Sequence, residues 1–151
     1  MPHLHIRKAR PFDAGAMASL LNDIIAIGGT TALQGPLSGD ELRDWMSDDR
    51  ATWHVAEMGG DIVGFQWIEP QAGLPPDAAS IATFTKPGHQ GLGIGSALFD
   101  ATKKAAKAQG LRAIHAIIAD YNEGGRAYYR SRGFERVANA AEGKVVKVYR
   151  L

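Results

Sequence analysis

The sequence of 151 residues contains no cysteine. This excludes disulfides, zinc sites with cysteine ligands and thiol nucleophiles. Neither sign of charge is in excess, because 17 Lys and Arg against 16 Asp and Glu leave a formal net charge of +1. The balance predicts no nucleic-acid partner. No apolar run approaches the ~20 residues that span a bilayer, and the N-terminal MPHLHIRKAR lacks the apolar stretch of a signal peptide. We therefore expect a cytoplasmic protein without membrane contact.

The chain is expected to form one α/β domain over residues 1–151, since it shows no repeat, linker or low-complexity segment. Period-two and apolar runs predict strands at residues 4–9, 52–58, 61–69, 80–85, 112–119, 134–140 and 144–151. Helical periodicity predicts helices at residues 11–27, 40–46, 94–108 and 123–131. Asp13 is the expected N-cap of the first helix.

Glycine is concentrated directly before the third predicted helix. Gly91, Gly93 and Gly95 alternate with other residues in GLGIGS, residues 91–96. A plain turn needs one glycine, whereas alternate glycines free several consecutive N–H groups beside a helix N-terminus, which carries partial positive charge. The pattern predicts a cradle for a phosphate or pyrophosphate group.

Two kinds of phosphate cradle fit this loop. The loop differs from the dinucleotide fingerprint G-x-G-x-x-G at one position, because Ser96 replaces the third glycine. Asp120 stands where a ribose-binding acid belongs in that motif. Residues 86–90 separate the strand from the glycines, however, whereas that fingerprint begins at the strand end. The second cradle, Q/R-x-x-G-x-G/A, is matched by Gln90 to Gly95 without this difficulty.

The second cradle resembles the acetyl-CoA loop of the GNAT superfamily of N-acetyltransferases. A further block, NEGGRAYYRSRGF, is similar to that family's N-x6-Y-x3-G-F segment, with Asn122, Tyr129 and Gly133-Phe134 in place. The resemblance covers almost the whole chain. It implies a mixed, largely antiparallel twisted sheet of six to seven strands with a splayed central parallel pair and flanking helices.

The resemblance also implies where acetyl-CoA binds as cosubstrate. Backbone groups of Thr83, Phe84 and Thr85 would hold the acetyl carbonyl and the pantetheine amides. Amides of the loop would hold the pyrophosphate, and Asn122 would contact the pantetheine arm. The loop residues implied are Gln90, Gly91, Leu92, Gly93, Ile94, Gly95 and Ser96.

The segments NDIIAIGGTTA (residues 22–32) and AIIADYN (residues 116–122) are similar to the phosphinothricin-acetyltransferase branch of that family. This implies a small amine or an amino-acid-like substrate, and homodimers are common in the branch. Three positions depart from the branch pattern: Ser80 replaces Glu, Gly125 replaces Ser or Ala, and Gln90 replaces Arg. The missing Glu leaves the general base unassigned.

Acetyl transfer from a thioester to an amine needs a deprotonated amine, donors for the oxyanion, and a proton or hydrogen bond for the departing thiolate. Tyr129 is the candidate general acid, and the resemblance places it near the sulfur. Tyr128 lies about 100° around the helix from Tyr129, and the Tyr128→Phe substitution is expected to change kcat very little. The candidate bases are Glu57, Glu69, His54 and His115, with a water chain as an alternative. No metal is expected, because His3 and His5 lack a neighbouring carboxylate or cysteine.

The sequence thus predicts an acetyl-CoA-dependent N-acetyltransferase acting on the primary amine of a small molecule. The alternatives are acetylation of a protein or peptide N-terminus, and a non-catalytic acyl-CoA-binding regulator on the same fold. The loop between residues 28 and 39, with Trp45, is expected to shape the acceptor pocket.

Overall fold

Seven strands form one sheet in the computed structural model, which describes residues 3–29, 33, 35–89, 91–137 and 142–151. In chain order the elements are β1 (Leu4–Lys8), η1 (Pro11–Asp13), α1 (Ala14–Ile27), α2 (Gly39–Met46), β2 (Thr52–Met58), β3 (Asp61–Glu69), β4 (Ala78–Thr85), α3 (Ile94–Ala108), β5 (Ala113–Ala119), α4 (Glu123–Ser131), β6 (Glu135–Arg136) and β7 (Lys144–Arg150).

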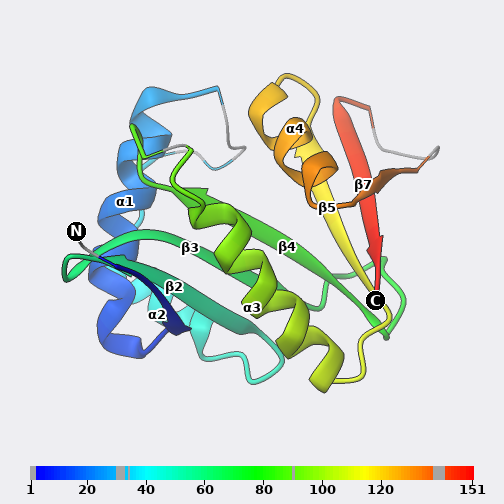
Figure 1. Cartoon of the computed structure of the whole chain (residues 1–151), viewed down its shortest axis with the longest axis horizontal. Helices are drawn as coiled ribbons and strands as arrows, with labels where there is room; N and C mark the ends of the chain where they lie inside the picture. Colours follow the sequence, from blue (N-terminus) through cyan, green and yellow to red (C-terminus); the bar gives the residue numbers. More distant parts are fainter. Residues whose placement is uncertain (1–2, 30–32, 34, 90, 138–141) are drawn as a thin grey trace.

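The sheet is antiparallel except at its centre. The strand order is β1-β2-β3-β4-β5-β7-β6, and β4 with β5 is the parallel pair. Their ladder extends only from Ala78 opposite Ala113 to Ser80 opposite His115. Beyond this point the two strands diverge, as Figure 1 shows. The expected fold class, a mixed and largely antiparallel sheet with a splayed central parallel pair, is confirmed.

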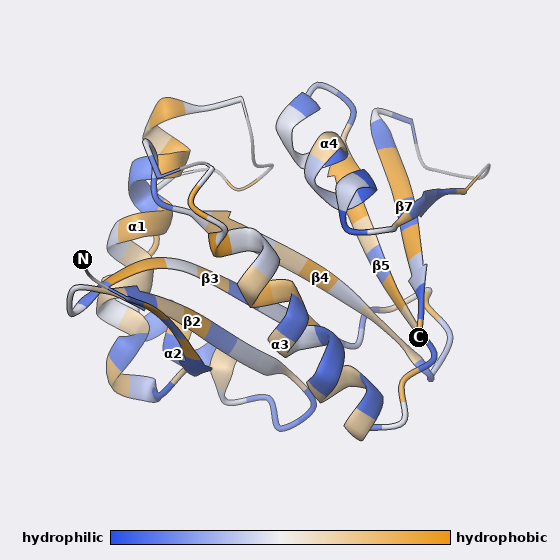
Figure 2. Cartoon of the chain, viewed as in Figure 1, coloured by the Kyte–Doolittle hydropathy of each residue, from blue (hydrophilic) through white to orange (hydrophobic). Residues whose placement is uncertain are grey.

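Helices cover both faces of the sheet. α1 and α2 lie on one face, α3 crosses the other face, and α4 lies beside α3 over β5 and β7 (Figure 1). Apolar residues recur along the strands, and the helices alternate between polar and apolar residues (Figure 2). Beneath α1 and α2 the core contains three aromatic side chains from β2 and β3, and Trp53 stacks on Trp67 with ring centroids 4.1 Å apart. None of the helices in the described ranges has an apolar stretch long enough to cross a membrane.

Local sequence signals explain most element ends. Gly59 and Gly60 both have positive φ values, +61° and +84°, as the tight turn between β2 and β3 requires. Ser38 accepts a hydrogen bond from the Glu41 amide and caps α2. Gly110, at φ +81°, follows the C-terminal end of α3.

Two element ends differ in detail from the expectation. Asp13 stands at the N-cap position of α1, as expected, but its side chain makes no capping hydrogen bond. Its buried carboxylate instead accepts hydrogen bonds from both terminal nitrogens of Arg7 at 2.8 Å and from the Arg10 amide at 2.7 Å. The strand expected at residues 134–140 is β6, of only two residues. Phe134 lies in the core before it, and residues 138–140 lie outside the described residues.

Candidate active site

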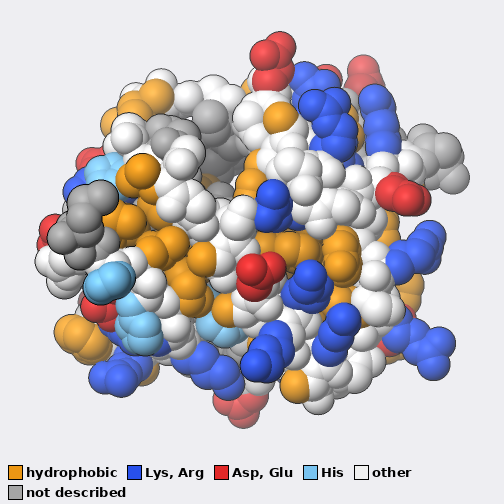
Figure 3. Space-filling model, in the orientation of Figure 1, with side chains coloured by type: hydrophobic (Ala, Val, Ile, Leu, Met, Phe, Trp, Pro, Cys, Tyr) orange, Lys and Arg blue, Asp and Glu red, His pale blue; other side chains and the backbone are white. Residues whose placement is uncertain are grey.

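A cleft of about 780 Å³ opens where β4 and β5 separate. From Ile81 to Thr85, the β5-facing edge of β4 has no strand partner among the described residues. Figure 3 shows the surface hollowed between the C-terminal end of α1 and α4. The cleft is lined by most of the residues that the sequence predicted: Thr83, Phe84, Thr85, Gly91, Gly93, Ile94, Gly95, Ser96, Asn122 and Tyr129. Leu92 is 52% exposed and is not part of the lining, and Gln90 lies outside the described residues.

The loop before α3 has the backbone that an anion cradle requires. Gly91 and Gly93 have φ values of +84° and +79°, and a Cβ atom on either would meet nothing within 4 Å. Gly93 is the N-cap of α3, and none of the described side chains caps this helix end. Among the described residues the first amides of α3 therefore have no cap acceptor, and they border the open cleft.

Gly95 lines the cleft and also has a packing role that the sequence did not predict. It lies within α3, and a Cβ atom there would come 2.6 Å from Cε1 of Tyr128. The third glycine of the loop is therefore explained by the packing of α4 against α3 rather than by the approach of a ligand.

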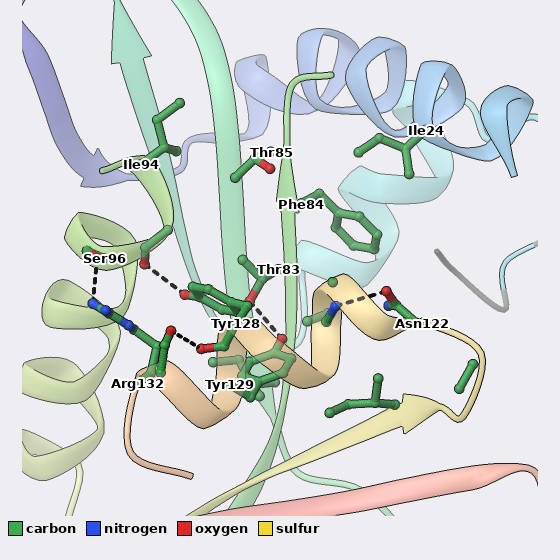
Figure 4. Close-up of a pocket in the computed structure, with 18 of the residues that line it drawn as sticks. Ile24, Thr83, Phe84, Thr85, Ile94, Ser96, Asn122, Tyr128, Tyr129 and Arg132 are labelled. Atoms are coloured by element: carbon green, nitrogen blue, oxygen red, sulfur yellow. Dashed lines mark hydrogen bonds between the residues drawn. The ribbon is translucent and has the colours of Figure 1, made fainter. Parts of the chain in front are cut away.

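Asn122 caps α4 at the edge of the cleft. Its side-chain oxygen accepts a hydrogen bond of 2.9 Å from the Gly125 amide (Figure 4). A Cβ atom on Gly125 would lie 2.6 Å from Nδ2 of Asn122. Glycine at position 125 thus lets the Asn122 side chain fold back over the first turn of α4.

Tyr129 reaches the cleft from α4 but is mostly enclosed by the core. Its residue is 7% exposed, and its hydroxyl lies 2.8 Å from Oγ1 of Thr83 on β4 (Figure 4). Burial raises the pKa of Tyr129, and the hydrogen bond with Thr83 opposes that rise. The hydroxyl is therefore protonated throughout the neutral range and can serve as a donor.

Tyr128, for which the sequence predicted little effect of a Phe substitution on kcat, has a hydroxyl that is hydrogen-bonded on both sides. Its hydroxyl donates to the carbonyl oxygen of Gly95 at 2.7 Å and accepts from Nε2 of Gln66 at 3.1 Å. Burial raises the pKa of Tyr128 to about 12. One turn further along α4, Arg132 donates from Nη1 to Oγ of Ser96 (Figure 4). Sequence reasoning missed Tyr128, Gln66 and Arg132; a single Gln in the apolar run of β3 was the one available signal.

The four candidate bases do not line the cleft. Glu57 is paired with Arg7, and Glu69 lies at the far end of β3 opposite Ser80. His54 is 6% exposed; burial, then the charge of Lys8, lowers its pKa. Burial and then Arg150 lower the pKa of His115. Within the described residues, no Asp or Glu lines the cleft and no three His, Asp or Glu side chains are grouped to hold a metal ion.

At the end of the cleft away from α3, the lining residues that the structure describes are apolar. Ile24 and Ile27 of α1, Leu33, and the rings of Trp67 and Phe84 line it. Trp45, expected at this pocket, packs against Trp67 instead, with ring centroids 6.2 Å apart, and is not part of the lining. Trp67 is therefore the tryptophan that shapes the cleft.

Comparison with known proteins agrees with this geometry. Residues 23–134 match the model of the acetyltransferase (GNAT) family. The chain is 28% identical over 138 residues to phosphinothricin N-acetyltransferase from Streptomyces viridochromogenes, covering 87% of this chain and 74% of that protein.

Solved structures show the same fold. A phosphinothricin acetyltransferase from Sinorhizobium meliloti, in complex with acetyl-CoA, has a TM-score of 0.83 at 20% identity and covers 98% of this chain and 88% of its own. An N-acetyltransferase from Staphylococcus aureus has a TM-score of 0.84 at 22% identity, covering 99% and 98%. Both resemblances inferred from the sequence are confirmed. The chain therefore belongs to the acetyltransferase (GNAT) family and is an acetyl-CoA-dependent N-acetyltransferase.

Proposed function

We propose that this enzyme acetylates the primary amine of a small molecule with an apolar or amino-acid-like body. Two observations support this substrate class. The acceptor end of the cleft is apolar, and a relative of 28% identity is named for phosphinothricin, a small molecule. Apolar walls with few polar groups are typical of small-molecule sites.

The residues fit acetyl-CoA at the splayed strands. The open β4 edge from Thr83 to Thr85 would supply backbone groups to the acetyl carbonyl and the pantetheine amides. The amides from Gly91 to Ser96 would hold the diphosphate at the uncapped end of α3. Asn122 would contact the pantetheine arm. The adjacency of the open strand edge and the uncapped helix end is the observation that carries the proposal.

Tyr129 would act as general acid. Its buried hydroxyl is protonated at neutral pH because its pKa is raised, and it lines the cleft from α4. Tyr129 Oη would donate its proton to the sulfur as the carbon–sulfur bond breaks. A backbone N–H on the open edge of β4 would donate to the oxyanion.

The amine's proton would leave through water. No carboxylate lines the cleft among the described residues, and the predicted bases lie elsewhere. The neutral amine is then the reactive form. The rate should rise with pH toward the pKa of the amine itself, and an inflection near pH 6 that does not change with the amine would instead indicate a side-chain base.

A panel of amines with acetyl-CoA, read by thiol release, tests the proposal. The chain adds no thiol background because it contains no cysteine. Release with small amines supports the proposed substrate class, and release only with peptides would assign a protein N-terminus instead. If neither the small amines nor the peptides cause thiol release while acetyl-CoA still raises Tm, the result would favour the non-catalytic acyl-CoA-binding regulator. Acetyl-CoA at 100 times its Kd should stabilise the fold by about 2.7 kcal/mol, whereas NAD should not.

The Tyr129→Phe variant tests the acid. It removes one oxygen and keeps the ring, so kcat should fall by roughly 10²-fold with little change in KM. An unchanged kcat, measured where chemistry limits turnover, would remove Tyr129 from the role of acid.

A further inference from the structure

A chain of buried hydrogen bonds leads to the Tyr129 hydroxyl from the centre of the sheet. Gln66 on β3 lies directly opposite Thr83 on β4 and is 0% exposed. Its Nε2 donates to Thr83 Oγ1 at 2.8 Å and to the Tyr128 hydroxyl at 3.1 Å. Thr83 Oγ1 in turn lies 2.8 Å from the Tyr129 hydroxyl (Figure 4).

The direction of these hydrogen bonds follows from counting protons. The carbonyl oxygen of Gly95 can only accept, so the single proton of Tyr128 points to it. Tyr128 must then accept from Gln66, which requires the NH₂ group of the amide at this contact. The second N–H of the same group donates to Thr83. Gly95 thereby fixes the orientation of the Gln66 amide.

Thr83 accepts from Gln66 and still has one proton to donate. The Tyr128 and Tyr129 hydroxyls both lie near this hydroxyl. Tyr128 already accepts from Gln66 and donates to Gly95, so Tyr129 Oη, 2.8 Å from Thr83 Oγ1, is the acceptor left for the Thr83 proton among the described residues. If Thr83 donates to Tyr129, the proton of Tyr129 has no acceptor among the described residues and is available to the cleft that Tyr129 lines.

We propose that Thr83 and Gln66 are positioning residues that direct the Tyr129 proton toward the leaving sulfur. This inference rests on the proposed acid role of Tyr129. As the O–H bond of Tyr129 breaks and an S–H bond forms, the Thr83 hydroxyl donates to the developing phenolate, which water later reprotonates. A hydrogen bond to the charged form stabilises it. The same contact opposes the effect of burial on the pKa of Tyr129.

Substitutions at Thr83 test the proposal. Thr83→Val keeps the shape and the backbone but removes the hydroxyl, and kcat should fall about tenfold with the KM for acetyl-CoA nearly unchanged. Thr83→Ser restores the hydroxyl and should recover most of kcat. Thr102→Val is the matched control, because Thr102 is fully buried in α3 and its hydroxyl has no partner among the described residues. Its kcat should not change.

A double-mutant cycle separates positioning from a general loss of packing. In the Tyr129→Phe background, Thr83→Val should cause no further loss of kcat, because Thr83 acts through the missing hydroxyl. Gln66→Met, which keeps the length of the side chain and removes both donors, should behave in the same way and serves if Thr83→Val folds poorly.

The outcomes distinguish this inference from the acid role itself. A roughly 10²-fold loss in Tyr129→Phe, with Thr83→Val and Gln66→Met at wild-type kcat, overturns the positioning role and leaves the acid in place. Additive losses in the double variant also overturn it, since Thr83 would then act independently of Tyr129. An unchanged kcat in Tyr129→Phe overturns both.

Discussion

The ring of Tyr128 occupies the space that a side chain on Gly95 would need. The Tyr128 hydroxyl donates to the carbonyl oxygen of Gly95 at 2.7 Å, and a Cβ atom on Gly95 would lie 2.6 Å from the ring. This contact joins the first turn of α3 directly to α4, and both residues line the cleft. Two residues 33 positions apart thus hold α3 and α4 together beside the proposed acetyl-CoA site.

Gly95→Ala should destabilise the protein by about 2 kcal/mol, since the added methyl group collides with a buried ring. Urea unfolding measures the loss. Tyr128→Leu should recover part of it in the double variant, because the shorter side chain leaves room for the methyl group. If Gly95→Ala lowers the stability equally with Tyr or Leu at position 128, the contact between Gly95 and Tyr128 does not limit packing.

Gly93→Ala should reduce acetyl-CoA affinity more than it reduces stability. The site is open, so the variant meets no collision, and the positive φ of +79° costs about 1 kcal/mol. A methyl group at the cradle would hold the diphosphate away from the amides, and we expect Kd to rise at least about tenfold. Calorimetric titration of acetyl-CoA measures this. Wild-type affinity would place the diphosphate elsewhere.

Asp13→Asn should destabilise the protein by about 2 kcal/mol at pH 7, because it leaves the Arg7 guanidinium without its main partner. Arg7 lowers the pKa of Asp13 below 3.8. The ion pair's contribution is therefore complete above the unfolded-state pKa and is lost as pH falls through the lower folded-state value. Urea unfolding from pH 7 to pH 2 should show a shallower acid loss in the variant. Asp48→Asn, which breaks an exposed pair with Arg50, is the control and should change the profile much less, because solvent screens that pair.

Lys147→Met should stabilise the protein by about 1 kcal/mol at pH 7. Lys147 is 8% exposed on β7; burial, then the charges of Arg130, Arg126 and Arg136, lower its pKa. Lys and Arg side chains gather over α4 and β7 in Figure 3.

The penalty on the charged Lys147 is complete below its folded-state pKa and disappears as pH rises toward the unfolded value of 10.5. The gain in Lys147→Met should therefore shrink at high pH. Thermal unfolding at pH 7 and pH 10 measures it, with the exposed Lys104→Met as the matched control. A loss of stability at pH 7 would mean that Lys147 has a favourable partner.

Local patterns in the sequence determined most of the fold and the position proposed for the cosubstrate site. The period-two runs on either side of Gly59 and Gly60 predicted the hairpin, and the apolar stripe from Ile94 predicted α3. Gly91 and Gly93 predicted the cradle because only glycine readily adopts their positive φ values. These features depend on residues close together in the chain, so they can be read without knowing the tertiary structure.

Only the tertiary structure decided which side chains meet. The register between β3 and β4 places Gln66 opposite Thr83, and the packing of α4 on α3 puts Tyr128 against Gly95. None of the four candidate bases lines the cleft. A shift of one residue in strand pairing reverses the face of every side chain. The sequence therefore proposed Tyr129, and the sheet register decided which side chains lie beside its hydroxyl.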